Sequence, residues 1–182
     1  MANFTPLKIL PVDIQNDFGA ELFSAIPAKM GCYRLVDARR TEGSSYQGQR
    51  ITVLVIDENG VAIPGIPVGF SYSTADKYTL TTDFDWQPPG PHRAFIARTG
   101  GSGEIDMVLG ADGVVKSGGA GGVSVYILQA EHSSDVITGC GQLADHTGMY
   151  LVFQLLRAGV EPLDKRLGGI EARLAALEAK KE

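Results

Sequence analysis

The fold class of this chain is decided by residues 49–74, QRITVLVIDENGVAIPGIPVGFSYST. Its first half places apolar residues at every second position, which is the period of a β-strand: Ile51, Val53 and Val55. Residues 57–60, DENG, end this pattern and predict a hairpin turn. A second strand is expected beyond two prolines, which suit a strand start or an edge. Its side chains on one face are Val68, Phe70 and Tyr72.

Similar short patterns, separated by turn residues, continue on both sides of this stretch. Strands are expected within residues 32–43, 77–83, 104–113, 123–127 and 147–159. The last of these is apolar on both faces, which indicates a central or buried strand. The 23 glycines favour a turn-rich β protein. Roughly seven to nine strands with close turns predict a mainly β fold, an immunoglobulin-like β-sandwich over residues 31–158.

Composition narrows the classes of function. The net charge of −5 and pI near 5.2 leave no basic excess for nucleic acid or an anionic membrane surface. No run of residues is apolar enough to span a bilayer, and the first residues lack the basic and apolar regions of a secretion signal. Cys32 and Cys140 do not have the CxxC spacing of a zinc ribbon. We expect them to be free, buried thiols, and we expect no cofactor.

Residues 1–30 show neither strand alternation nor a sustained helical period. They carry too many large apolar side chains for a solvated tail: Phe4, Leu7, Ile9, Leu10, Phe18, Leu22 and Phe23. The segment is expected to be an extended arm that packs on something. A neighbouring subunit and the chain's own domain are equally good candidates.

Residues 159–182 have a different pattern. Apolar residues are spaced four, three, four and three apart, the heptad period of a coiled coil: Leu163, Leu167, Ile170, Leu174 and Leu177. In a parallel coiled coil Arg166 would pair with Glu171, and Arg173 with Glu178, on the partner helix. We expect an oligomerising helix, with Leu and Ile placement favouring a trimer. The alternative is a lone amphipathic helix packed on its own domain.

Around residues 51–128 the chain resembles bacterial immunoglobulin-like domains of the invasin and intimin kind. The matching residues lie in and after the quoted turn: Asp57, Asn59, Gly60, Pro64, Gly65, Pro67, Val68 and Phe70. Residues 97–109, ARTGGSGEIDMVL, resemble the same family's threonine, glycine turn and following strand. The chain departs from the family at residues 85–95 and 133–146. This second segment, with the closing strand, is similar to immunoglobulin-like modules of phage virion proteins and bacterial glycoside hydrolases.

The resemblance implies an extracellular scaffold or adhesin, which normally needs a secretion signal. A virion protein needs none, because it is made in the cytoplasm and released by lysis. We therefore expect a non-enzymatic structural protein located in a bacteriophage virion, such as a head decoration, head fibre or tail accessory protein. Its partners would be its own copies and other virion proteins, such as capsid or tail.

Residues 131–146, EHSSDVITGCGQLADH, resemble catalytic or metal-binding sequence in composition. A divalent ion held by His132, Asp135, Asp145 and His146 would make the protein a metal-dependent hydrolase. A serine hydrolase would use His132, Ser133 and Asp135, but adjacent residues point in different directions. We favour a third interpretation, a polar loop in which Ser133, Ser134 and Asp135 cap backbone amides.

Another candidate site is the proline-containing loop with the chain's single tryptophan. Its residues could form an aromatic and polar platform for a host surface glycan: Trp86, Phe84, Tyr78, Asp85 and His92. This carbohydrate-binding or adhesin module is the first alternative function. The opposing interpretation is that Trp86 plugs an end of the sandwich.

Overall fold

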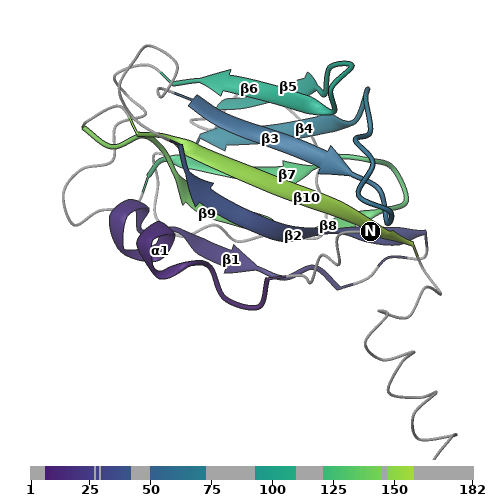
Figure 1. Ribbon diagram of the computed structural model, residues 1–182, viewed down its shortest axis with the longest axis horizontal. Coiled ribbons are helices and arrows are strands. Elements are labelled where there is room, and N and C mark those ends of the chain that lie inside the picture. The colour runs from purple at the N-terminus through teal and green to yellow at the C-terminus, as the bar shows by residue number, and fades with distance from the viewer. Residues whose placement is uncertain are drawn as a thin grey trace, which may run out of the picture.

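The computed structural model describes residues 7–26, 28, 30–41, 50–72, 93–109, 121–144 and 147–157. Within them lie one short helix and ten strands (Figure 1). Helix α1 spans Val12–Phe18, and the strands are β1 (Glu21–Phe23), β2 (Gly31–Arg40), β3 (Arg50–Ile56), β4 (Pro67–Tyr72), β5 (Arg93–Arg98), β6 (Glu104–Val108), β7 (Val123–Ile127), β8 (Ser133–Ser134), β9 (Val136–Cys140) and β10 (Met149–Arg157).

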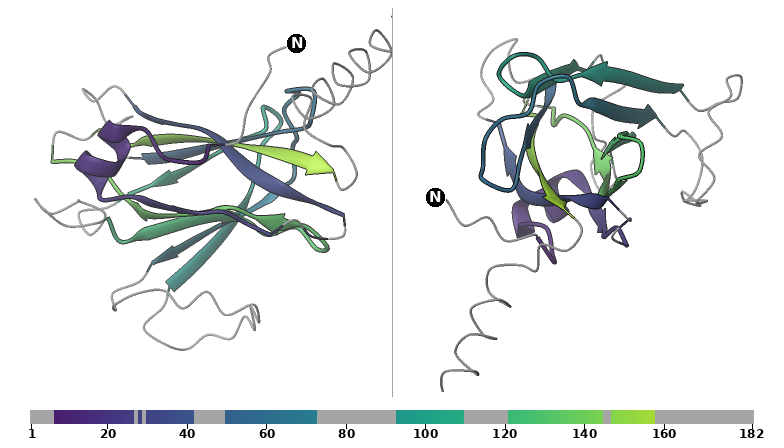
Figure 2. Two further views of the ribbon diagram at one scale, coloured as in Figure 1. Left: turned by 90° about the horizontal axis from the view of Figure 1, so that it is seen from below. Right: turned by 90° about the vertical axis from the view of Figure 1, so that its right-hand side faces the viewer.

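The strands form two five-stranded sheets, in the orders β1-β9-β7-β4-β5 and β6-β3-β10-β2-β8. Figure 2 shows the sheets as two layers. Apolar side chains from both layers fill one core, including Phe70 from β4 and Phe153 from β10. The expected mainly β sandwich is confirmed at this level. The second sheet is mixed, because β10 pairs in parallel with β3 and antiparallel with β2.

The turn predicted at DENG is present, but the two strands it joins lie in different sheets. The Asp57 carboxylate accepts hydrogen bonds from the amides of Asn59 and Val61, and one antiparallel bridge follows, between Ile56 and Ala62. The chain then turns at Gly65, where φ is +77°, and crosses to the other sheet. Glycine adopts such a φ without a steric penalty. The hairpin interpretation is therefore wrong beyond its first residue pair.

Strand β10 is central in its sheet, as its two apolar faces predicted. Leu151 and Phe153 point into the core between the sheets, and neither is exposed. On the opposite face Val152 packs with Val36 and Ile56 in a smaller apolar cluster. A strand buried on both faces and paired on both edges is a rigid element.

The N-terminal residues described here do not form an extended arm. Ile14 and Phe18 of α1 are fully buried in the main core, and β1 pairs with β9 of the same chain. The helix ends at Gly19, whose φ of +60° allows the turn into β1. Residues 7–26 therefore pack on the chain's own domain, which was one of the two candidates for their partner, and they complete the sandwich. The apolar spacing did not reveal this, since a helix of seven residues and a strand of three are too short to show a period.

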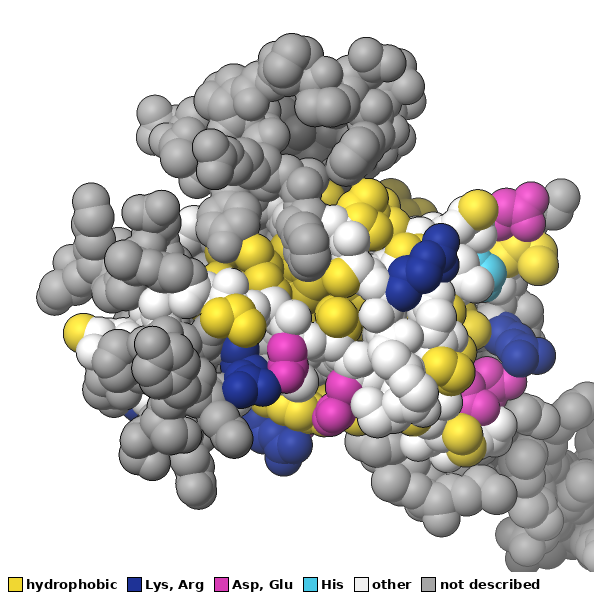
Figure 3. Space-filling view, turned by 90° about the horizontal axis from the view of Figure 1, so that it is seen from above, with side chains coloured by type: hydrophobic (Ala, Val, Ile, Leu, Met, Phe, Trp, Pro, Cys, Tyr) yellow, Lys and Arg dark blue, Asp and Glu magenta, His cyan; other side chains and the backbone are white. Residues whose placement is uncertain are grey.

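The far edge of the sandwich is formed by β5 and β6, each paired on one side only among the described residues. Figure 3 looks onto this edge, where hydrophobic side chains gather beside charged ones. Val108 is 70% exposed there, and Arg50 pairs with Asp106. Val108 is therefore an exposed apolar residue in an edge strand.

Candidate functional site

Residues 131–135 lie where the chain passes from one sheet to the other. Ser133 and Ser134 form β8 and pair in parallel with Cys32 and Tyr33 of β2. After Asp135 the chain enters β9 in the opposite sheet. Within residues 131–146, which were expected to be a polar loop, residues 133–134 and 136–140 are strand, and the polar side chains of Ser133, Ser134 and Asp135 bond to neighbouring backbone.

Asp135 is the centre of this region. Its side chain has no exposed surface, yet both carboxylate oxygens are hydrogen-bonded. Oδ1 accepts the amide of Ala25 at 2.7 Å, and Oδ2 accepts the amide of Leu35 at 2.9 Å. The Nε of Arg34 lies 3.2 Å from Oδ2. One side chain therefore joins the segment after β1, strand β2 and the crossing between sheets.

Burial raises the pKa of Asp135, and it outweighs the two amide hydrogen bonds and the Arg34 charge, which act to lower it. An ionised carboxylate at this place is tolerated because its neighbours are donors. Leu35 N would otherwise face an open sheet edge, since β8 pairs only with the two residues Cys32 and Tyr33. The carboxylate replaces the missing strand as acceptor.

The two serines have similar roles. Ser133 Oγ accepts the amide of Ala28 at 3.1 Å, and Ser134 Oγ accepts the amide of Ile127 at 2.9 Å. Ser134 also donates to the carbonyl of Asp135 at 2.7 Å. The expectation that these residues cap backbone amides is confirmed. Arg34 Nη1 donates to the carbonyl of Ala25 at 3.0 Å. We call Arg34, Ser133 and Asp135 the clasp, because their side chains hold the backbone of Ala25 and Ala28.

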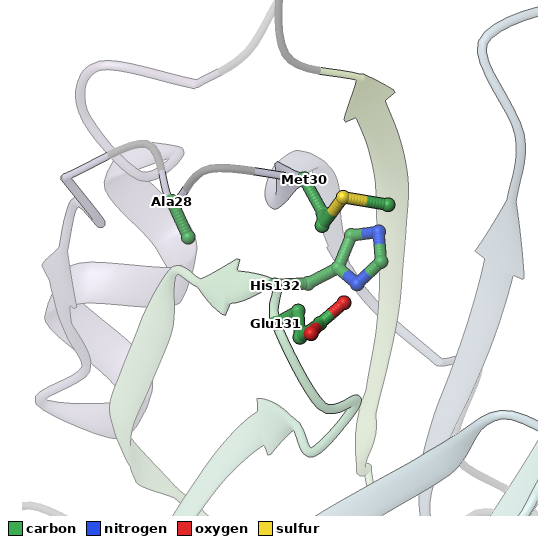
Figure 4. Close-up of a pocket in the computed structure, with 4 residues that line it drawn as sticks. All are labelled: Ala28, Met30, Glu131 and His132. Atoms are coloured by element: carbon green, nitrogen blue, oxygen red, sulfur yellow. The ribbon is translucent and has the colours of Figure 1, made fainter.

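A hollow of about 490 Å³ lies beside the clasp, lined by Ala28, Met30, Glu131 and His132 (Figure 4). Glu131 has a φ of +65°, a conformation that costs a non-glycine residue energy and marks a constrained turn. The amide of Met30 donates to the carbonyl of Glu131 at 3.4 Å, which ties the two walls together. The hollow is open and mainly apolar on one side.

The Tyr33 ring packs against His132, one of the residues that line the hollow. Their ring centroids are 5.7 Å apart, and the Tyr33 hydroxyl donates to the side-chain carbonyl of Gln129. Burial raises the pKa of Tyr33 to about 12. His132 is half-buried, and its Nδ1 lies 3.0 Å from the carbonyl of Ala130. The imidazole is thus positioned by neighbours in its own turn.

The described residues do not assemble the alternative metal site. His132 and Asp135 are both described, but Asp135 is engaged by protein donors, and no group of three metal-ligating side chains occurs in the ranges given above. Asp145 and His146 lie outside the described residues. So do the loop candidates Tyr78, Phe84, Asp85, Trp86 and His92, and all nine coiled-coil positions.

Cys32 and Cys140 are free and buried, as expected from their spacing. Gly139, beside Cys140, has a φ of +73°, and a Cβ there would lie 2.5 Å from the carbonyl oxygen of Gly19. Gly139 thus forms a tight bend beside the buried Cys140. It brings the end of α1 directly against β9.

Sequence reasoning missed Arg34 and the backbone amides of Ala25, Ala28 and Leu35, the partners of the clasp. A charged residue inside the apolar run of β2 was the available signal, because a buried guanidinium requires an acceptor. The amides give no signal in sequence, since every residue has one.

Across the part of the chain that is described, no helix combines the length and apolar character needed to cross a membrane. Comparisons with protein-family models, with curated proteins and with solved structures gave no match.

Proposed function

We propose that this protein is a non-enzymatic structural component of a bacteriophage virion, a head decoration, head fibre or tail accessory protein that assembles as a trimer. The trimer would form through the heptad positions Leu163 to Leu177. The immunoglobulin-like assignment of the sandwich is part of this proposal and rests on the resemblance around residues 51–128.

The observation that carries the proposal is the position of β10. This central strand ends at Arg157, and the heptad segment begins six positions later at Leu163. A segment that continues from a strand hydrogen-bonded on both edges is anchored to the whole sheet. Such an attachment suits a protein whose domain must be held firmly by its oligomerising segment.

The clasp supports a structural rather than a catalytic role. The serine hydroxyls and the aspartate carboxylate that most resembled a catalytic set are hydrogen-bonded to backbone amides. A nucleophile must instead be presented to a substrate beside a base. In the described residues these groups hold the fold together.

The assembly is tested by light scattering of the full chain across a concentration series. We expect three times the chain mass of 19.3 kDa. The double variant Leu167→Asp/Leu174→Asp places charges at two core heptad positions and should give a monomer. Ala172→Asp/Ala179→Asp adds the same charges at outward positions of the same heptads and should stay trimeric. An intact chain that remains a monomer at its highest soluble concentration contradicts the proposal.

The virion setting needs a separate measurement. Mass spectrometry of particles purified from the phage or lysogen that encodes the chain should detect it in stoichiometric amount. Its presence in the cell lysate but not in washed particles would contradict this part of the proposal.

A further inference from the structure

Residues 158–182, which we call the tail, follow β10 at the end of the sandwich where the clasp and the hollow lie. Arg157, the last residue of β10, is the register partner of Gly31, and Gly31 follows Met30. Cys32 in turn is the partner of Ser133. Figure 1 shows β10 ending beside β8 and the first residues of β2. The departure point of the tail and the walls of the hollow are therefore neighbours.

This end of the sandwich exposes apolar side chains. Ile26 is 88% exposed and Met30 is 49% exposed, and each lies two positions from Ala28, whose amide the clasp holds. Together with Glu131 and His132 we call these residues the tail-end face: Ile26, Ala28, Met30, Glu131 and His132. A single exposed apolar residue needs no explanation, but two within five positions, one of which (Met30) lines an open hollow, indicate an interaction surface.

The clasp fixes the backbone of this face at single points. The backbone on either side of Ile26 is fixed by hydrogen bonds from Ala25 to Asp135 and from Ala28 to Ser133. The Met30 amide is bonded to Glu131. Apolar side chains on a fixed backbone lose less conformational entropy on association than those on a free loop. The clasp thus gives the face a property that a binding surface needs.

We propose that the tail-end face is a contact between copies of this chain, and this inference rests on the proposed trimer. A parallel coiled coil brings the first residues of its helices to within about 10 Å of one another. The segment from Arg157 to Leu163 spans at most about 20 Å when fully extended. Each sandwich is therefore tethered close to the trimer axis by the end that carries Ile26 and Met30. The occupant of the hollow is a second copy.

Charge is compatible with this contact. The face itself carries a single carboxylate, that of Glu131, with the half-buried His132 beside it. Arg157 at the start of the tail is paired with Glu58 at 3.3 Å, so its charge is already balanced. Like copies can approach through such a surface because little net charge opposes them.

The test is oxidative footprinting of the full chain, read by mass spectrometry at methionine, with the assembly size measured on the same sample. The monomeric Leu167→Asp/Leu174→Asp variant is the reference. We expect Met30 to oxidise several-fold more slowly in the trimer than in this variant. Met107, which is 6% exposed and lies on β6, should oxidise equally in both.

A second measurement uses charge on the face. Ile26→Asp and Met30→Asp should each raise the concentration at which the trimer dissociates by on the order of tenfold, because each removes an apolar side chain from the contact. Val108→Asp changes an apolar residue of the far edge whose exposure, 70%, lies between those of Met30 and Ile26, and it should leave that concentration unchanged.

The outcomes separate the two proposals. A trimer whose Met30 oxidises as fast as in the monomeric variant, and whose dissociation does not respond to Ile26→Asp, overturns the tail-end contact and leaves the trimer standing. A full chain that is monomeric overturns both. A trimer with protected Met30 and weakened face variants supports both.

Discussion

Replacing Asp135 with alanine should destabilise the fold more than any surface substitution. The carboxylate accepts the amides of Ala25 and Leu35 and lies 3.2 Å from the Nε of Arg34. Alanine supplies no acceptor, and the site is closed to water because Asp135 has no exposed surface. In a single change two amides would lose their acceptor, and the Arg34 guanidinium would lose its counter-charge.

The magnitude follows from those groups. A buried donor without a partner costs about 1–3 kcal/mol, so two amides account for most of the loss. Removing one member of a buried ion pair costs about 3–5 kcal/mol, and the relief of burying the carboxylate is part of that difference. We therefore expect Asp135→Ala to lower the free energy of unfolding by about 3–5 kcal/mol. Asp135→Asn keeps the volume and one acceptor, and should lower it by about 1–3 kcal/mol.

The assay is urea unfolding followed by circular dichroism, with hydrogen exchange at the Ala25 and Leu35 amides. Asp37→Ala is the matched control, because Asp37 also lies in the second sheet but its side chain is 41% exposed and 3.7 Å from Arg39. An exposed pair of this kind contributes about 0–1 kcal/mol. If Asp135→Ala unfolds at the same urea concentration as the control and the Ala25 and Leu35 amides exchange at unchanged rates, Asp135 does not stabilise the fold as predicted.

The pH dependence of the free energy of unfolding, compared between the wild-type protein and Asp135→Asn, gives an independent check. Burial raises the pKa of Asp135 above its ordinary value of 3.8, so the folded state binds this proton more tightly than the unfolded state. The stability from this group is then fully present below 3.8 and is lost as pH rises through the folded pKa. The wild-type advantage over Asp135→Asn should shrink with rising pH and level off above that pKa. An advantage that grows with pH would show that Arg34 and the amides outweigh burial.

Three further predictions concern other parts of the core. Cys32 and Cys140 are buried, so a thiol reagent should label neither in the native protein and both after denaturation; fast native labelling would contradict this. Gly139→Ala should lower the free energy of unfolding by about 2 kcal/mol or more, because alanine at a φ of +73° is strained and its Cβ would meet backbone. Gly101→Ala is the control, since a Cβ there meets no atom within 4 Å, and it should be near neutral in urea unfolding. Tyr33 should ionise near pH 12, as should Tyr150, whose pKa burial also raises to about 12, so the late step in ultraviolet absorbance should lose amplitude in Tyr33→Phe without disappearing. A titration curve unchanged by Tyr33→Phe would contradict that assignment.

The strand pattern could be read from sequence because it depends on short-range periodicity. Ile51, Val53 and Val55 alternate, and each is fully buried in β3. The two apolar faces of β10 correctly predicted a central strand. The same reasoning failed at α1 and β1, since a helix of seven residues and a strand of three leave no measurable period.

The candidate site shows the same division. Its residue types predicted that Ser133, Ser134 and Asp135 would bond to backbone, and they do. Which backbone they bond to could not be predicted, because Ala25 and Asp135 are 110 positions apart. Sheet pairing alone brings them together.

The sequence by itself determined that this chain is a β-sandwich with a heptad pattern in its final segment, because alternation and heptads are local properties of side-chain spacing. Only the tertiary structure decided that the turn at Asp57 connects two different sheets and that residues 7–26 complete the core. It also decided that Met30 lies beside the point where the chain leaves β10. These are long-range pairings, and their free energy depends on surfaces that meet only after the sheets have packed.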